Sequence, residues 1–203
     1  MLQTFKSNLL KEAQLVFARF GVNRLSESEL MEALHVAPAT FYGLFRDKDD
    51  LVVQAMAYDL ERQKQEHQEL FANFSTPVER LLAVYAHGYN EMSKVTGNAI
   101  LEIQHLHPKA WNLMQDHLKN YGFLMLRDLI QEGVLQQQLR HDIDIELVTK
   151  ILMEMLNMVL NHELFPPDQY TRAEVMRSAH FYYIRGLCTD SGLRLVSSHF
   201  AKL

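Results

Sequence analysis

The sequence is poor in cysteine and in long apolar runs, and each shortage excludes a class of protein. A single cysteine, Cys188, excludes an intramolecular disulfide, and no CxxC or Cys/His cluster surrounds it, so we expect it to pack as a small hydrophobic side chain. No segment supplies the ~18 uninterrupted apolar residues of a membrane span. The first residues also lack the basic start, apolar stretch and cleavage site of a secretory signal, so the expected location is the cytoplasm.

An excess of positive charge is missing too. The 203 residues include 20 Lys and Arg against 25 Asp and Glu, which gives a formal net charge of -5. Residues 1–50 alone hold six basic and seven acidic side chains. The sequence therefore argues against nucleic-acid binding through overall basicity, and any contact with DNA has to be local.

Alternating runs of the β type are rare, and apolar residues recur almost everywhere at helical spacing. The 8 glycines and 5 prolines stand mostly where helices are expected to begin or end. We therefore expect an all-α protein. A first helix ends at Gly21, a second begins at Ser26, and the segment after Gly192 is either a short helix or frayed. Further helices are predicted over residues 38–45, 48–72, 77–95, 99–106, 108–133, 145–164 and 171–187.

Local signals support two of these helix starts and describe one helix face. Ser26 and Glu29 have the S-x-x-E spacing of a capping box. Thr76 is the expected cap of the helix over residues 77–95, with Glu79 three residues later. The polar run ERQKQEHQE, residues 61–69, is typical of a solvated helix face.

The second and third helices are short and joined by a tight turn at His35 and Val36. That arrangement lays a recognition helix in the major groove of DNA. Within the third helix, Phe41 and Phe45 lie one turn apart and are predicted to pack against the first helix. The side expected to face DNA carries Pro38, Ala39, Tyr42 and Gly43.

Four stretches of this region form a more specific pattern. They are Phe17-Ala18-x-x-Gly21, Leu30 to Ala33, Val36, and Thr40-Phe41-Tyr42-x-x-Phe45-x-x-Lys48-x-x-Leu51. In them, residues 9–51 resemble, without a gap, the DNA-binding domain of the TetR family of transcriptional regulators. The resemblance implies a three-helix helix-turn-helix domain at residues 1–50 and a larger helical ligand-binding and dimerisation domain at residues 51–203.

Residues 123–164 resemble the family more loosely, because a helix ending at a glycine is followed there by an acidic loop and an apolar helix. The resemblance implies that helices 145–164 and 171–187 pair with their symmetry mates in a homodimer, whose two-fold axis matches a palindromic operator. Their apolar content also exceeds what one helix face buries internally. The residues concerned are Ile151, Leu152, Met155, Leu156, Val159 and Leu160 on the first helix and Phe181, Tyr182, Ile184 and Leu187 on the second.

By the resemblance, Thr40, Tyr42 and Lys48 bind DNA phosphates, a task suited to hydroxyl donors and a lysine. Two alternatives stay open, namely that Tyr42 packs in the core and that Lys48 is a solvated charge. The predicted DNA-binding residues are Ser26, Ser28, Ala37, Pro38, Ala39, Thr40, Tyr42, Gly43 and Lys48.

The sequence departs from the family where bases are usually read. Ser28, Pro38, Gly43 and Leu44 stand where arginine, lysine or histidine is common, and His35 replaces the usual turn glycine, which it can do if it adopts a positive φ. Bidentate base-reading side chains are therefore missing. We expect modest sequence specificity dominated by phosphate contacts, with bases read through apolar contact with thymine methyls, through Ser28, or through DNA shape.

The region from residue 77 to 164 is rich in aromatic, histidine and methionine residues, which suits a small, largely hydrophobic effector. The resemblance implies a repressor that such an effector releases from its operator. Each of these residues taken singly is also compatible with ordinary core packing. The predicted ligand-binding residues are Tyr89, Trp111, His117, Tyr121 and Met125.

Two other functions are weighed against a regulator. An enzyme would need a site such as a metal held by His105, His107 and His117, but i,i+2 spacing does not put two side chains on one helix face, and no HExxH motif is present. We expect no catalysis, cofactor or metal. The second alternative is a TetR-like helical protein with weak DNA binding that acts through protein partners, which the acidic balance and the missing base readers favour.

Overall fold

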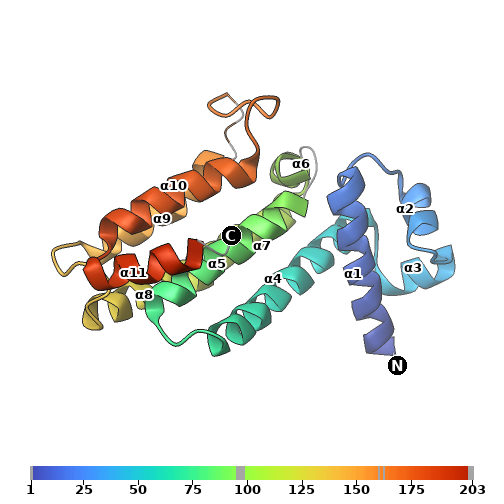
Figure 1. The fold of residues 1–203 in the computed structure, drawn as a ribbon. Helices are drawn as coiled ribbons and strands as arrows, with labels where there is room; N and C mark the ends of the chain where they lie inside the picture. Colours follow the sequence, from blue (N-terminus) through green and yellow to red (C-terminus); the bar gives the residue numbers. More distant parts are fainter. Residues whose placement is uncertain (1, 95–98, 160, 162, 201–203) are drawn as a thin grey trace. The chain divides into compact units, whose positions relative to one another are not determined.

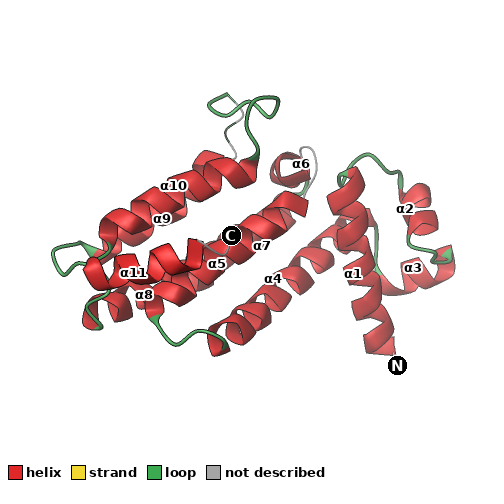
Figure 2. Cartoon of the chain, viewed as in Figure 1, coloured by secondary structure: helices red, strands yellow, loops and turns green. Residues whose placement is uncertain are grey.

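The computed structural model describes residues 2–94, 99–159, 161 and 163–200, and every regular element among them is a helix (Figures 1 and 2). The all-α prediction is confirmed. No described helix is both long and apolar enough to cross a membrane. The helices are α1 Leu2–Phe20, α2 Glu27–Ala33, α3 Pro38–Leu44, α4 Lys48–Ala72, α5 Pro77–Lys94, α6 Ala99–Leu106, α7 Pro108–His117, α8 Phe123–Leu135, α9 Ile145–Val159, α10 Arg172–Leu187 and α11 Asp190–Phe200.

The predicted local signals set the helix boundaries. Gly21 ends α1 with a φ of 85°, and its N–H donates to the carbonyl of Phe17 at 2.9 Å. Ser26 and Glu29 form the predicted capping box of α2. The Thr76 hydroxyl accepts a hydrogen bond from the backbone N–H of Glu79 at 3.3 Å at the start of α5.

Two long helices differ from the prediction. The helix expected over 108–133 is interrupted by a π-helical turn, Leu118–Gly122, between α7 and α8. The helix expected over 145–164 ends at Val159, and Leu160 lies outside the described residues. The Asn161 side-chain oxygen accepts the backbone N–H groups of Glu163 and Leu164 at 3.0 and 3.1 Å, so a side-chain turn replaces the last helical turn.

The chain divides into two compact units, and it crosses between them three times, each time inside a helical segment. The first unit contains residues 1–66 and 94–118, and the second contains 67–93 and 119–203. The first unit thus extends beyond the DNA-binding domain predicted at residues 1–50, because α6 and α7 pack on its core through Ile103 and Ala110.

Each unit has its own apolar core. In the first, Phe41 and Phe45 pack with side chains of α1, α2 and α4, and in the second α5, α8, α9, α10 and α11 surround Ile130 and Leu152. Cys188 is buried in the second core as expected, and burial raises the pKa of its thiol to about 11. Residues 61–69 were predicted to form a solvated helix face. That prediction is wrong at His67, which is buried.

Candidate nucleic-acid interface

The two faces of α3 have opposite environments. Phe41 and Phe45 are 0% and 2% exposed and hold the helix on the core of the first unit. Tyr42 is 54% exposed, and its ring meets the Phe41 ring edge-on with centroids 5.3 Å apart. The alternative that Tyr42 is a core residue is therefore wrong. Thr40 and Gly43 are exposed as well, so α3 presents a free face of small and hydroxyl-bearing residues.

The turn between α2 and α3 is built by His35 and Val36. His35 adopts a φ of 51°, the left-handed conformation that its position in place of a glycine requires. Val36 is buried, and its N–H donates to the carbonyl of Met31 at 3.0 Å. Together they anchor the turn, and α3 begins two residues later at Pro38 with Ala37 as its cap.

The start of α2 is occupied by its own cap. The Ser26 hydroxyl donates to the Glu29 carboxylate at 2.6 Å and accepts the Glu29 N–H at 3.3 Å. These hydrogen bonds from Ser26 hold the pKa of Glu29 below its usual value. Ser28 is exposed beside them. Ser26 thus shapes the helix start, while Ser28 remains open to a DNA contact.

The side chain of Lys48 is hydrogen-bonded to the protein's own backbone. Its Nζ donates to the backbone carbonyl of Leu25 at 2.6 Å, and the side chain is half-buried. Burial lowers the pKa of Lys48, and the carboxylates of Glu102, Glu27 and Glu29 oppose that shift. The alternative of a plain solvated charge is wrong.

Sequence reasoning did not include Arg46, which lies two residues after the end of α3. Its side chain is 76% exposed, and its guanidinium pairs with the Asp50 carboxylate at 3.2 Å. Exposed arginines commonly bind DNA phosphates. The position of Arg46 directly after Phe45 was therefore a sequence signal for a DNA contact. The candidate interface accordingly combines the α3 face with a cation at its end.

The five predicted effector residues are distributed over both units. Trp111 and His117 belong to the first, and Tyr89, Tyr121 and Met125 belong to the second. His117 is buried with its Nε2 at 2.8 Å from the Gln63 side-chain oxygen. Tyr89 and Met125 are partly buried against the core of the second unit.

Tyr121 belongs to an aromatic cluster that the sequence did not indicate. Its hydroxyl lies 3.0 Å from Nδ1 of His67, and the two rings stack with centroids 5.8 Å apart. The His67 ring also stacks on Phe71 and meets His87 edge-on. The only sequence signal was the i,i+4 spacing of His67 and Phe71 at the end of a polar run.

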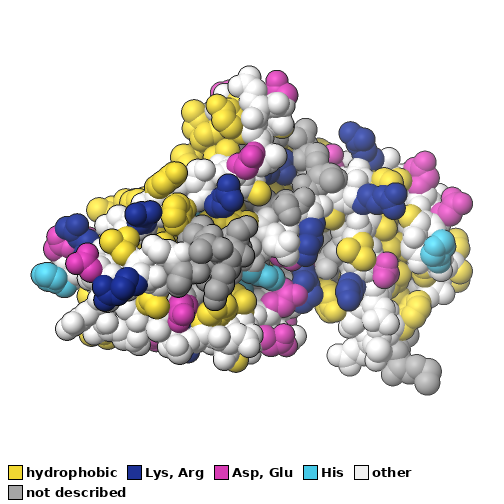
Figure 3. Space-filling view, in the orientation of Figure 1, with side chains coloured by type: hydrophobic (Ala, Val, Ile, Leu, Met, Phe, Trp, Pro, Cys, Tyr) yellow, Lys and Arg dark blue, Asp and Glu magenta, His cyan; other side chains and the backbone are white. Residues whose placement is uncertain are grey.

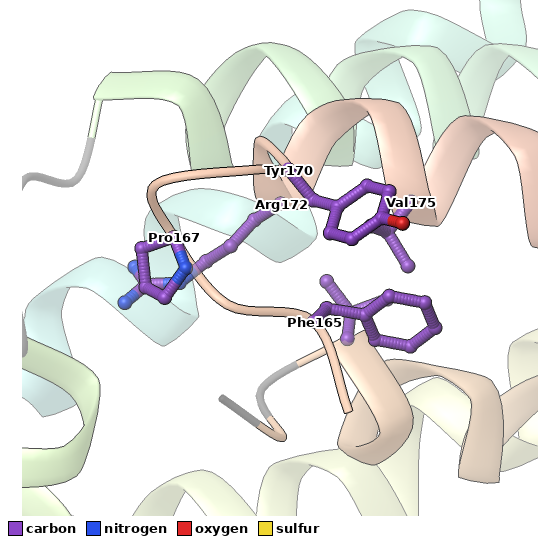
Figure 4. A pocket seen from close by; sticks show the side chains of 6 residues that line it. Phe165, Pro167, Tyr170, Arg172 and Val175 are labelled. Atoms are coloured by element: carbon purple, nitrogen blue, oxygen red, sulfur yellow. The ribbon is translucent and has the colours of Figure 1, made fainter. Parts of the chain in front are cut away.

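Figure 4 shows a pocket in the second unit, at the loop before α10. Its volume is about 10 Å³, less than a drug-sized ligand needs by more than an order of magnitude. The rings of Phe165 and Tyr170 meet edge-on at 5.8 Å on its wall. None of the five predicted effector residues lines it; its lining residues are Val159, Phe165, Pro167, Tyr170, Arg172 and Val175.

The three histidines considered as metal ligands have separate environments. His105 is exposed, whereas His107 is buried with its Nδ1 at 2.9 Å from an Asp49 oxygen, and His117 contacts Gln63. Across the described part of the chain, no three His, Cys, Asp or Glu side chains are grouped as metal ligands would be.

Comparison with known proteins finds a family match in the first part of the chain and a similar fold over most of its length. The family model "Bacterial regulatory proteins, tetR family" matches residues 9–55. A TetR family regulator from Agrobacterium tumefaciens superimposes with a TM-score of 0.74 at 16% identity, over 93% of this chain and 100% of that one. A TetR family regulator from Cytophaga hutchinsonii gives 0.70 at 21% identity, over 93% and 97%.

A protein from Saccharomonospora viridis in complex with choline gives a TM-score of 0.75 at 15% identity, over 92% of this chain and 99% of that one. No curated protein matches the sequence. Residues 9–55 therefore form a helix-turn-helix of the TetR type, and the described chain has the fold of TetR family regulators.

Proposed function

We propose that this regulator is a homodimeric repressor that binds a palindromic operator through α2 and α3. The observation that carries the proposal is the free face of α3, on which Thr40, Tyr42 and Gly43 are exposed while Phe41 and Phe45 fix the helix from behind. The face has hydroxyl groups for phosphates and small residues that allow a close approach of the DNA backbone. Arg46 adds a cation at its end.

A second copy of the chain is the proposed partner in the dimer. Hydrophobic side chains gather on the surface over α9 and α10 (Figure 3), and Leu147 and Tyr182 are 55% and 71% exposed there. Covering such side chains removes apolar area from water. An isologous two-fold contact through these helices also gives the two recognition helices that a palindrome requires.

The proposed effector is a small, largely hydrophobic molecule, and its predicted contacts are Tyr89, Trp111, His117, Tyr121 and Met125. The relative from Saccharomonospora viridis was solved with choline, a quaternary ammonium compound, and aromatic rings such as Tyr121 and Tyr89 bind that group well. Preferential binding of the effector to one conformation of the protein is the proposed source of different DNA affinities with and without effector.

The test of DNA binding is a selection of random duplexes by the purified full-length protein at low and physiological salt. We expect enrichment of a palindrome by the wild type, and weaker binding to all sequences for Tyr42→Ala. The control is Gln65→Ala, an exposed change on α4 that should bind as wild type. Failure to enrich any palindrome at low salt would favour the alternative of a helical protein that acts through protein partners.

The test of the effector is thermal shift with small aromatic and quaternary ammonium compounds, choline included, followed by release of the selected DNA. Tyr121→Ala should abolish the response to an active compound. Tyr170→Ala is the matched control, since it changes an aromatic residue at the pocket of Figure 4. If Tyr170→Ala abolishes the response and Tyr121→Ala does not, the effector binds at the α10 loop instead.

A further inference from the structure

In the loop between α1 and α2, residues 21–26, the backbone N–H groups of Val22 and Asn23 find their acceptor outside α1. Val22 is buried, so its N–H needs a partner inside the protein. The carboxylate of Glu102 on α6 supplies it. Oε2 of Glu102 accepts the N–H of Val22 at 2.8 Å and the N–H of Asn23 at 3.1 Å, across about 80 residues of chain.

Gly21 makes room for this carboxylate. A Cβ on Gly21 would lie 3.0 Å from Oε2 and 3.2 Å from Oε1 of Glu102, and the φ of 85° already disfavours any other residue. The glycine therefore ends α1 and admits Glu102 to the loop at the same point.

The other end of the loop is held by a cation. Nζ of Lys48, the first residue of α4, donates to the carbonyl of Leu25 at 2.6 Å, and Ser26, the cap of α2, follows directly. Glu102 attracts the Lys48 ammonium, so the two side chains support each other. The Glu102 carboxylate thus accepts the N–H groups of Val22 and Asn23 near the start of the loop, and the Lys48 ammonium donates to the carbonyl of Leu25 near its end.

We propose that Glu102 and Lys48 are positioning residues for DNA recognition, which hold the α1–α2 loop and thereby set the placement of α2 and α3 on the first unit. Their proposed effect on DNA recognition is exerted through the loop. The inference rests on the proposed function for its effect on DNA affinity, while the restraint of the loop itself is a property of the free protein.

The experiment compares Glu102→Ala and Glu102→Gln in the full chain by hydrogen exchange and by affinity for the selected DNA. Glu102→Ala leaves the Val22 and Asn23 N–H groups without their acceptor, so exchange at residues 22–30 should accelerate and DNA affinity should fall about tenfold or more. The amide oxygen of Glu102→Gln can still accept them and should restore most of both. Gln104→Ala, an exposed change on the same helix, should change neither.

Ile130→Val controls for a general loss of stability. It removes one methylene group from the core of the second unit, so it should lower stability and leave DNA affinity unchanged. The proposal is overturned if Glu102→Ala binds DNA as tightly as the wild type, or if Glu102→Gln is as impaired as Glu102→Ala. If the wild type itself binds no DNA, the proposed function fails, and hydrogen exchange still decides on the loop. Unchanged exchange at Val22 and Asn23 in Glu102→Ala then overturns the inference on its own.

Discussion

The Nζ of Lys48 lies 2.6 Å from the backbone carbonyl oxygen of Leu25, so the lysine expected to bind phosphate is bonded to its own protein. We predict that Lys48→Met weakens DNA binding without changing its salt dependence, because the loss acts through the loop. A lysine that neutralises a phosphate would instead lower the log–log salt slope by about 1. Binding titrations from 50 to 300 mM salt, roughly the range over which such slopes are measured, distinguish the two.

Gly43 offers a test of how closely DNA approaches α3. A Cβ at this position meets no described atom within 4 Å, so Gly43→Ala should stabilise the helix by about 0.5–1 kcal/mol. If DNA lies against this face, the added methyl should weaken binding while the melting temperature rises. Unchanged DNA affinity in Gly43→Ala would place the DNA backbone elsewhere.

Gly192→Ala is the contrasting glycine variant. Gly192 lies in the first turn of α11, and a Cβ there would be 2.1 Å from the backbone carbonyl oxygen of Gln138. We predict a clear loss of stability in chemical unfolding, since backbone atoms have to move to admit the methyl. Equal unfolding midpoints for Gly192→Ala and wild type would mean that the start of α11 is not packed as described.

His180 predicts a pH dependence of stability. It is fully buried, its ring nitrogens face the carbonyls of Met176 and Leu152 at 2.9 and 3.2 Å, and the centroid of the Tyr85 ring lies 4.2 Å from its own. Burial lowers the pKa of His180 below its ordinary value of 6.5 in spite of these carbonyls. The unfolded chain therefore takes up a proton at His180 more readily than the folded protein does. The contribution of neutral His180 to stability is complete above the pKa of the unfolded chain and is lost as the pH falls toward the lower pKa of the folded protein.

Urea unfolding just below neutrality and about two pH units lower should show that decline, and His180→Gln should reduce it. His117 contributes in the same direction, because burial and the nearby Lys64 lower its pKa as well. The exposed His141 provides the control, and His141→Gln should keep the full difference between the two pH values. A decline of the same size in His180→Gln would assign the effect to other groups.

The exposed ring of Tyr182 on α10 is predicted to lie in the dimer contact. Tyr182→Asp should shift the protein toward monomer in sedimentation experiments and should weaken binding to a palindrome, because two half-sites are then no longer bound together. Leu135→Asp changes a residue of α8 that is equally exposed, at 73%. A monomer produced by Leu135→Asp and not by Tyr182→Asp would move the contact away from α9 and α10.

Local features of this protein were predictable from neighbouring residues. The capping box of Ser26 and Glu29 and the glycine end of α1 depend on groups within one or two helical turns of each other, and the i,i+4 spacing of Phe41 and Phe45 puts both on one face. For such features the backbone geometry of a helix already determines which atoms meet. The helix-turn-helix and its family resemblance followed for the same reason.

Features formed across the chain were beyond that reasoning. The polar run 61–69 has the composition of a solvated face, yet the packing of the second unit buries His67 against Tyr121, 54 residues away. Likewise, the end of α9 depended on which acceptor the N–H groups of Glu163 and Leu164 found, the side-chain oxygen of Asn161 or helical backbone carbonyls. Residue type permits either outcome, and the surroundings select one.

The sequence by itself determined the all-helical scaffold, the helix boundaries set by caps, and the exposed face of α3. Only the tertiary structure decided what the charged residues around that scaffold do. By residue type alone, Lys48 suits a phosphate contact and Glu102 suits a solvated surface position. Instead, Lys48 binds the Leu25 carbonyl and Glu102 accepts the Val22 N–H, because α4 and α6 reach the same loop. Buried backbone N–H and carbonyl groups need partners, and the fold determines which side chains are near enough to provide them.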